Sequence, residues 1–175
     1  GLLTIRSVNG NTPPLAVDDE YTTNEDTLLS VPAAGILAND SDLDDDGLSA
    51  ILVDGPAHGT LALNDDGSFH YTPDADYFGP DRFSYRAFDG SDESGIATVS
   101  LTVTPVNDAP EAVNDGYAVH HGQTLSVPAA TGALANDSDP DGDTLTAALD
   151  SFPQYGSLSF LEDGSFEYIP YPGYV

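Results

Sequence analysis

The sequence predicts an all-β protein made of tandem seven-stranded Greek-key β-sandwiches, of which the second is incomplete. Three observations lead to this fold class. Long segments of the sequence occur twice, at a spacing typical of a whole domain. Within each copy, short apolar stretches that alternate with polar residues are separated by turns rich in Asp, Gly and Pro. The only helix-like stretch, AAGILAN (33–39), is too short for more than a turn or two.

Three pairs of matching segments define the repeat. The offset between the copies is 96 residues at Pro14 and Pro110, and it becomes 97 after one inserted residue near Thr131. A repeat of this length is a complete domain rather than a unit of a solenoid. The pairs are PLAVDDEYTT (14–23) with PEAVNDGYAV (110–119), LSVPAAGILANDSD (29–42) with LSVPAATGALANDSD (125–139), and HGTLALNDDGSFHYTP (58–73) with YGSLSFLEDGSFEYIP (155–170).

Seven stretches of the first copy have the composition of strands. They are AVDDEYTT (16–23), LLSVP (28–32), LSAILVD (48–54), GTLAL (59–63), SFHYTP (68–73), DRFSYRAF (81–88) and ATVSLTV (97–103). Asp-Gly steps at 66–67 and 163–164 predict hairpin turns. In the last two stretches the period of two is clear, so each should turn one apolar face to the core. These faces consist of Phe83, Tyr85 and Ala87 and of Val99, Leu101 and Val103.

The repeat also sets the expected domain limits. The second copy runs from Pro110 to Val175 and has no counterpart of 79–108, which holds the last two strands. The opening LTIRSVN resembles LTVTPVN (101–107), so we expect 1–12 to be the last strand and linker of a preceding repeat, 13–109 a complete sandwich and 110–175 a truncated one. Either the sequence is a piece of a longer protein, or a strand from another chain completes the second repeat by strand addition.

Composition and charge exclude several functions. The chain carries 30 acidic residues against three basic ones, with a formal net charge of −27. Nucleic acid and anionic membrane surfaces are poor partners for such a charge, whereas a hard divalent cation is a good one. The absence of Cys and Lys excludes disulfides, thiolate metal sites and Schiff-base chemistry. No run of 18 apolar residues occurs, so we expect no membrane insertion.

Two clusters each have four aspartates at alternate positions. They are ANDSDLDDDG (38–47), with Asp40, Asp42, Asp44 and Asp46, and ANDSDPDGD (135–143), with Asp137, Asp139, Asp141 and Asp143. Either these are solvated turns, which Asp favours, or they hold a cation. An EF-hand is excluded because Val53 stands at its twelfth position and Thr144 stands where the loop requires Gly.

Three motifs in order carry a resemblance that covers essentially the whole chain. They are NEDT (24–27) after the first strand, DSDPDGD (137–143) before the third strand of the next repeat, and VTPVNDAP (103–110) between the repeats. Together they resemble the bacterial cadherin-like and Ig-like tandem repeats of giant RTX-type adhesins, relatives of the VCBS and dystroglycan-type cadherin-like repeats. The resemblance implies a sandwich of the cadherin or immunoglobulin kind, with Ca²⁺ at the repeat junctions stiffening a rod.

The candidate ligands follow from the order of strands in a sandwich. The loop after the first strand and the end of the last strand lie at one pole, which the loop before the third strand of the next repeat should also reach. Three pieces of chain would then supply the six to eight oxygens that calcium prefers. The candidates are Glu25, Asp26, Asn107, Asp108, Asp137, Asp139, Asp141 and Asp143, and second in rank Asp42, Asp44, Asp46, Asp76 and Asp89.

Two poles should bind calcium weakly or not at all. Gly10 and Asn11 stand where the second linker has an acid, so we expect the pole at 40–46 to be empty or weakly occupied. In the second copy NED becomes HHG (120–122), which removes the carboxylates from that pole.

Asp74 and Asp81 are further candidate ligands near the pole that contains Glu25.

We expect no enzyme, because no nucleophile motif or paired-carboxylate cleft is evident. The predicted function is a calcium-rigidified structural or adhesive repeat of a large secreted or surface-anchored bacterial protein, which extends a distal binding domain. Its partners would be the neighbouring repeats of the same parent chain. The alternative is a carbohydrate- or protein-binding accessory module of a large secreted enzyme, with Tyr77, Phe78, Tyr171 and Tyr174 as aromatics that could stack on sugars.

Overall fold

A computed structural model describes residues 10–120 and 122–173. The chain divides into two compact units, residues 1–106 (unit 1) and 107–175 (unit 2). Residues 1–9, predicted as a preceding strand, as well as His121 and Tyr174, lie outside the described residues. Apart from strands, the described residues form two short 3₁₀ turns, η1 (Gly35–Leu37) and η2 (Ala129–Thr131), and contain no helix long and apolar enough to cross a bilayer.

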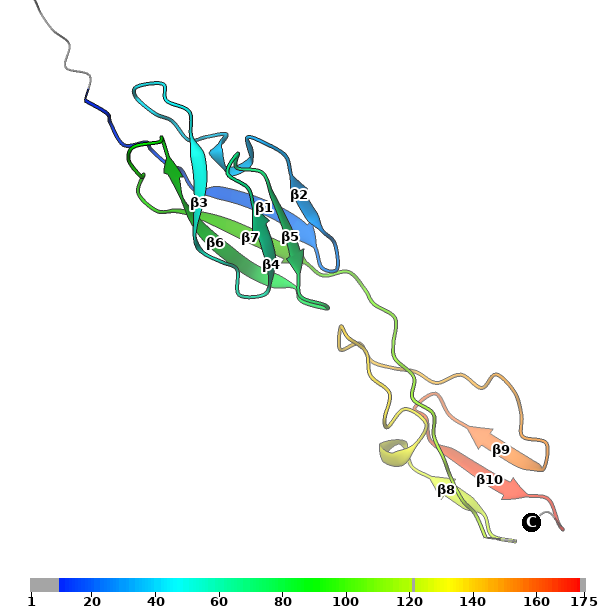
Figure 1. Ribbon diagram of the computed structural model, residues 1–175. Coiled ribbons are helices and arrows are strands. Elements are labelled where there is room, and N and C mark those ends of the chain that lie inside the picture. Colours follow the sequence, from blue (N-terminus) through cyan, green and yellow to red (C-terminus); the bar gives the residue numbers. More distant parts are fainter. Residues whose placement is uncertain (1–9, 121, 174–175) are drawn as a thin grey trace, which may run out of the picture. The chain divides into compact units, whose positions relative to one another are not determined.

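Unit 1 is a sandwich of seven strands in two sheets (Figure 1). One sheet has the order β1-β7-β6-β3, with β1 (Asp19–Asn24), β3 (Ser49–Asp54), β6 (Gly79–Phe88) and β7 (Ala97–Thr104). The other has the order β2-β5-β4, with β2 (Leu29–Val31), β4 (Gly59–Leu63) and β5 (Phe69–Pro73). The β1–β7 pair is parallel and the other pairs are antiparallel. The predicted all-β sandwich is therefore confirmed.

The core of unit 1 lies between these sheets. The residues predicted to face it from β6 and β7 are all buried, namely Phe83, Tyr85, Ala87, Val99, Leu101 and Val103. Phe69 and Tyr71 of β5 meet them from the other sheet and are fully buried. The Phe69 ring packs edge-on against Tyr21 at 5.1 Å and against Phe83 at 5.3 Å between centroids. Burial of large aromatic side chains is the main stabilising term in such a core.

Unit 2 contains one three-stranded sheet in its described part, with the order β8-β10-β9. The strands β8 (Leu125–Val127), β9 (Gly156–Phe160) and β10 (Phe166–Pro170) correspond through the repeat to β2, β4 and β5. Residues 115–120 and 146–151, which correspond to β1 and β3, form no strand. In unit 1 these two strands pair only with β7 and β6, for which the described part of unit 2 has no counterpart.

Both units hold the start of the repeat against the Asp-rich loop in the same way. Leu15 and Ser41 form an isolated antiparallel bridge in unit 1, and Glu111 and Ser138 form the same bridge in unit 2. The bridge closes with N···O distances of 2.8 and 3.1 Å in both copies. The Asp-rich loops are therefore fixed relative to the first residues of each repeat.

Candidate metal centre

The Asp-rich loop of unit 1 is folded by its own carboxylates. Asp42 Oδ1 accepts hydrogen bonds from the backbone N–H of Asp44 at 2.7 Å and of Asp46 at 3.3 Å. Asp44 Oδ2 accepts one from Thr12 N at 2.8 Å. Aspartate readily bonds backbone N–H groups two residues ahead, which is why it favours such turns. The loop thus gathers three carboxylates beside the chain that enters the repeat.

The loop of unit 2 repeats this geometry. Asp139 Oδ1 accepts hydrogen bonds from Asp141 N at 3.0 Å and from Asp143 N at 3.2 Å. Asp141 Oδ2 accepts one from Asp108 N at 2.7 Å, and Asn107 Nδ2 donates to Asp108 O at 2.8 Å. Five of the predicted ligands of unit 2 are therefore brought together on one loop and the linker residues that it contacts.

One carboxylate oxygen in the Asp-rich loop of unit 1 has an environment that suits a metal ligand better than a turn-forming group. Asp42 Oδ2 is buried and has no hydrogen-bond partner among the described residues. A buried polar atom without a partner costs about 1–3 kcal/mol, and more when it is charged. Carboxylate and carbonyl oxygens are the ligands that Ca²⁺ prefers, and they are what this loop contains. The donor set therefore fits the cation that the sequence predicts.

A second acidic group lies where β1 ends in unit 1. Glu25 is only 2% exposed, although it is a carboxylate. Its backbone N–H donates to Thr104 O at 3.0 Å, and its Oε1 accepts a hydrogen bond from Val106 N at 2.5 Å. No basic side chain forms an ion pair with Glu25 among the described residues. A buried carboxylate without a basic partner is costly unless a cation or several hydrogen bonds compensate it.

Two further carboxylates lie at this end of unit 1. Asp26 and Asp76 both adopt the left-handed conformation, with φ of 52° and 56°. Asp76 N donates to Asp26 Oδ1 at 3.3 Å, which joins the turn after β1 to the loop after β5. Aspartate tolerates this backbone conformation better than most residues, so the strain alone does not identify a ligand. The structure does place the two predicted residues side by side.

At the opposite end of unit 1, the side-chain amide of Asn11 bridges two carboxylates. Asn11 Nδ2 donates to Asp89 Oδ2 and to Asp92 Oδ2, both at 2.9 Å. The backbone N–H of Asp92, helped by the Asn11 amide and Ser91 N–H, holds the pKa of Asp89 below its usual range. Asp89 thus joins the second-rank residues of the 42–46 loop at one pole, where Asp92 is a carboxylate that the sequence analysis did not single out.

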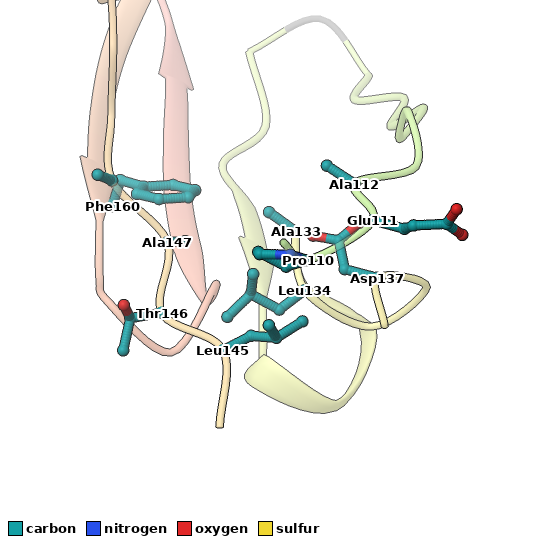
Figure 2. Close-up of a pocket in the computed structure, with 11 residues that line it drawn as sticks. Pro110, Glu111, Ala112, Ala133, Leu134, Asp137, Leu145, Thr146, Ala147 and Phe160 are labelled. Carbon is teal, nitrogen blue, oxygen red and sulfur yellow. The ribbon is translucent and has the colours of Figure 1, made fainter. Parts of the chain in front are cut away.

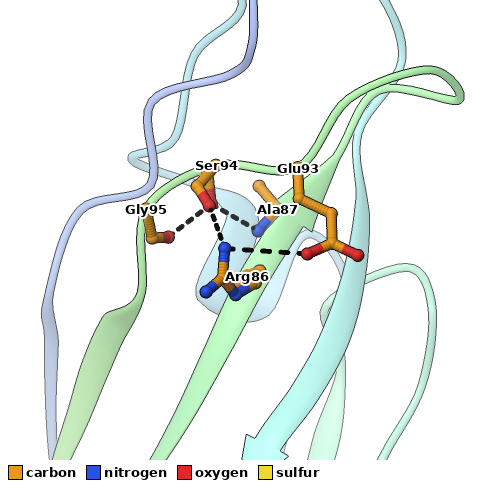
Figure 3. Close-up of polar contacts among 5 residues, drawn as sticks. All are labelled: Arg86, Ala87, Glu93, Ser94 and Gly95. Carbon is orange, nitrogen blue, oxygen red and sulfur yellow. Dashed lines mark hydrogen bonds and ion pairs between the residues drawn. The ribbon is translucent and has the colours of Figure 1, made fainter.

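The two arginines in the described part of the chain, Arg82 and Arg86, form no ion pair with these clusters. Arg86 is bound to the loop after β6, where its Nη1 lies 3.6 Å from Glu93 Oε2 and donates to Ser94 O at 3.0 Å (Figure 3). Ser94 Oγ in turn accepts a hydrogen bond from Ala87 N at 2.9 Å. Arg82 forms no ion pair among the described residues, and Arg6 lies outside them. The acidic charge of the loops is therefore left for a mobile or bound cation.

Two aspartates have structural partners instead. Asp81, considered as a candidate ligand, is buried in unit 1, and its two oxygens accept hydrogen bonds from the N–H groups of Ala57, His58 and Arg82 and from the Tyr71 hydroxyl. Four donors within unit 1 thus already satisfy its carboxylate, so Asp81 has a structural role without any metal. Asp137 Oδ1 accepts a hydrogen bond from Val113 N at 2.8 Å, a contact that no spacing rule indicated.

The aromatic residues considered for sugar binding have different environments. The ring of Tyr77 stacks on His58 at 4.1 Å between centroids, and its hydroxyl donates to Pro80 O at 2.7 Å. Phe78 is 48% exposed in unit 1, and Tyr171 is 55% exposed in unit 2. Tyr77 therefore packs on its own unit, and sugar binding stays a prediction that rests on Phe78 and Tyr171.

Comparison with known protein families matches both units. The model of the bacterial Ig domain matches residues 11–102, and the model of the bacterial cadherin-like domain matches residues 107–174. Among curated proteins, integrin beta-like protein E of Dictyostelium discoideum is 27% identical over 168 residues. The alignment covers 86% of this chain but only 8% of that relative.

Comparison with solved structures supports the architecture through a cadherin structure. The crystal structure of human CDH23 EC21-23 is 17% identical, with a TM-score of 0.52, over 93% of this chain and 60% of that one. An endo-fucoidan hydrolase of glycoside hydrolase family 107 is 18% identical, with a TM-score of 0.45, over 96% of this chain and 25% of that one. The likeness to the cadherin repeats supports the architecture, while the likeness to the hydrolase is too low to support an inference.

Proposed function

The chain belongs to the bacterial Ig domain family, and from this premise we propose that it is a calcium-stiffened structural or adhesive repeat of a large secreted or surface-anchored protein. Bacterial Ig and cadherin-like domains are typically extracellular, non-catalytic modules of adhesion or architecture. In this role the chain would act mechanically, by holding a distal binding domain away from the cell. The integrin beta-like relative is consistent with adhesion.

The observation that carries the proposal is the way carboxylates hold both ends of one short linker. Val106 N is bonded to Glu25, and Asp108 N is bonded to Asp141. Two residues of chain span at most about 7 Å, so the anchoring points of these two carboxylates are covalently kept close together. This supports a calcium site at residues 106–108, independently of how the rest of the two units is arranged.

The proposed ligands are residues of this linker and of the two turns whose carboxylates bond to it. Asp139 and Asp141 each bond backbone N–H groups through one named oxygen, and each has a second carboxylate oxygen. Bound calcium would neutralise these carboxylates and bridge chain segments from both repeats. The protein itself positions these carboxylates, because backbone hydrogen bonds hold them in place before any ion binds. The proposed set is Glu25, Asp26, Asn107, Asp108, Asp139 and Asp141.

The test is calorimetric titration of calcium into the complete chain after metal removal by a chelator. We expect saturable binding, and a rise in melting temperature when calcium is present. The Asp139→Asn, Asp141→Asn double variant should lose most of both effects. A matched control is Glu162→Gln, Glu167→Gln, which removes the same charge from exposed positions in unit 2. No binding at millimolar calcium, or equal loss in the control, would reduce the clusters to solvated turns.

A further inference from the structure

The outward face of strand β6 in unit 1 carries both basic side chains that the structure describes, Arg82 and Arg86. Every second residue of β6 is buried in the core, so the side chains between them point away from it. Arg82 and Arg86 are four positions apart and therefore share this outward face. The described residues hold no other Arg or Lys, so in a chain with a net charge of −27 their positive charge is confined to this face.

The two arginines differ in their partners. Arg86 Nη1 donates to Ser94 O at 3.0 Å and lies 3.6 Å from Glu93 Oε2, so this side chain is bound to its own unit (Figure 3). The Arg82 side chain is exposed, and its guanidinium makes no hydrogen bond or ion pair with any described residue. A guanidinium has five N–H donors in a planar arrangement that matches a carboxylate. Arg82 is therefore available to an anionic group from outside.

A pocket of about 430 Å³ lies beside Arg82, which is part of its lining. Three polar side chains of the lining form a row across the sheet. Ser84 of β6 pairs with Thr98 of β7 on one side and with Asp54 of β3 on the other. The Ser84 hydroxyl lies 3.4 Å from Asp54 Oδ2, so these two side chains share one face. Ile96, which is 56% exposed, adds an apolar wall.

Unit 1 itself fixes the walls of this pocket. The register of β3 with β6 shifts between Leu52 and Asp54, and such bulges redirect a side chain and often lie next to functional sites. The turn before β4 also lines the pocket, through Ala57. Ala57 N donates to the buried carboxylate of Asp81 at 2.9 Å, which holds this turn against β6. The binding groups are therefore preorganised, and this lowers the entropic cost of binding.

The pocket of unit 2 in Figure 2 is different in character. It has a volume of about 300 Å³, and its walls are mostly apolar, with Phe160 across from Pro110 and Leu134. The two charged side chains in its lining, Glu111 and Asp137, are both acidic. Among the described residues, only the pocket at Arg82 combines a guanidinium, a carboxylate and two hydroxyls.

The donors and acceptors of this pocket select the class of ligand. The net charge of the chain repels polyanions at long range, so a ligand with few charges, held by short-range contacts, is favoured. Asp54 requires hydrogen-bond donors on the ligand close to the anionic group that Arg82 binds. Hydroxyl groups meet this requirement, and they also pair with Ser84 and Thr98. Small-molecule sites commonly have volumes of about 300–1,000 Å³, a range that includes this pocket.

We propose that the pocket binds a carboxylated ring of an acidic saccharide. The sugar carboxylate would accept two parallel hydrogen bonds from Arg82, and its hydroxyls would donate to Asp54 and bond to Ser84 and Thr98. The C–H face of the ring would pack on Ile96. The pocket contains none of the exposed aromatic residues considered above for stacking on sugars, and the proposal does not depend on calcium.

The test measures binding of a trimer of galacturonic acid to the complete chain by NMR. Metal-free protein and buffer are used, so that calcium cannot bridge the carboxylates of sugar and protein. The methyl ester of the same trimer is the matched ligand, because it keeps the ring hydroxyls and loses the charge. The protein variants are Arg82→Gln, Arg82→Lys and Asp54→Asn. Arg86→Gln is the matched control, since it removes the same charge from the same face of β6, and melting of each variant checks its fold.

The acidic trimer should bind saturably and shift the backbone amide signals of Arg82, Ser84 and Thr98. The methyl ester, and the acid with Arg82→Gln, should each bind at least about 10-fold more weakly, because the charged hydrogen bonds are lost. Arg82→Lys should weaken binding several-fold, since an ammonium cannot form the paired bonds. Asp54→Asn should also weaken it several-fold, whereas Arg86→Gln should leave it nearly unchanged.

The proposal is overturned if the trimer does not bind saturably at millimolar concentration, or if acid and ester bind equally. Equal losses in Arg82→Gln and Arg86→Gln would also overturn it, because they would indicate general attraction of charge. Stronger binding by Asp54→Asn would replace the saccharide site with a simple anion site. If a variant melts early, the comparison of acid and ester on the unchanged protein still decides. None of these results bears on the calcium proposal, because no metal is present.

Discussion

In unit 1 the hydroxyl of Tyr71 donates a hydrogen bond to Asp81 Oδ2 at 2.8 Å. Tyr71 lies on β5 and Asp81 on β6, so this bond joins the two sheets of the sandwich. Asp81 also accepts hydrogen bonds from Ala57 N at 2.9 Å and His58 N at 3.0 Å, which tie the turn before β4 to the same carboxylate. One buried carboxylate thus organises three segments at the end of the sandwich.

Replacement of Asp81 by Ala should destabilise unit 1 by about 3 kcal/mol, because several buried donors lose their acceptor at once. Tyr71→Phe should cost about 1 kcal/mol, since it removes one hydrogen bond. Urea unfolding of each variant measures both values. Glu20→Gln on the exposed face of β1 is the control and should change stability little. A loss in Asp81→Ala no larger than in this control would contradict the bridging role.

The contribution of Asp81 to the stability of unit 1 should disappear at acidic pH. Burial acts to raise the pKa of Asp81, but the hydrogen bonds from Ala57, Arg82, Tyr71 and His58 outweigh it and hold the pKa below its usual range. A carboxylate with a lowered pKa stabilises the folded state above the unfolded pKa, and that stability is lost as pH falls through the folded value. The difference in unfolding free energy between wild type and Asp81→Asn should therefore shrink below about pH 4. A constant difference would assign the effect to packing.

Asp19 should have the opposite pH dependence. Burial, together with the neighbouring Asp40 carboxylate, raises its pKa to about 6. The folded state then binds a proton more tightly than the unfolded state, so this contribution is fully present below about pH 4 and is lost as pH rises through about 6. Asp19→Asn should stabilise unit 1 at pH 7.5 by about 1 kcal/mol, a value reduced for partial exposure. At pH 4 the variant and wild type should melt together.

The close contact of η1 with the β4–β5 turn predicts that Gly35 cannot be replaced. Gly35 has a φ of +55°, and an added Cβ would lie 1.9 Å from Gly67 O. Gly35→Ala should therefore cost about 2–4 kcal/mol, from backbone strain and from displacement of the turn. Gly47→Ala is the matched control, because a Cβ there meets nothing within 4 Å. Thermal melting that did not separate the two variants would contradict this packing.

The apolar strands could be predicted from the sequence because their signal is local. The alternation that buries every second residue in β6 and β7 is visible within a few residues, and it correctly placed Phe83 and Val99 in the core. The Asp-rich turns were visible for the same reason, since Asp139 bonds N–H groups only two and four residues ahead. Whether those turns hold calcium stays a prediction.

Contacts between distant segments could not be predicted in this way. Asp81 looks like any loop aspartate until β5 places Tyr71 beside it, and no spacing rule separates it from a candidate ligand such as Asp76. Residues 115–120 and 146–151 have the same difficulty, because their composition favours strands although the described chain offers them no partner. Strand formation depends on the neighbouring strand as much as on propensity.

Glu25 distinguishes a calcium ligand from a structural anchor. Glu25→Gln keeps the volume of the side chain and an oxygen that can accept from Val106 N, so the metal-free protein should lose less than about 1 kcal/mol. A ligand whose free concentration is 100 times its dissociation constant stabilises the folded state by about 2.7 kcal/mol. The variant should lose most of this stabilisation by calcium, because it lacks the negative charge of Glu25. Melting with and without calcium measures both effects. If Glu25→Gln keeps the full rise in melting temperature with calcium, Glu25 only anchors the linker. The same conclusion holds if Glu25→Ala loses equal stability with and without calcium.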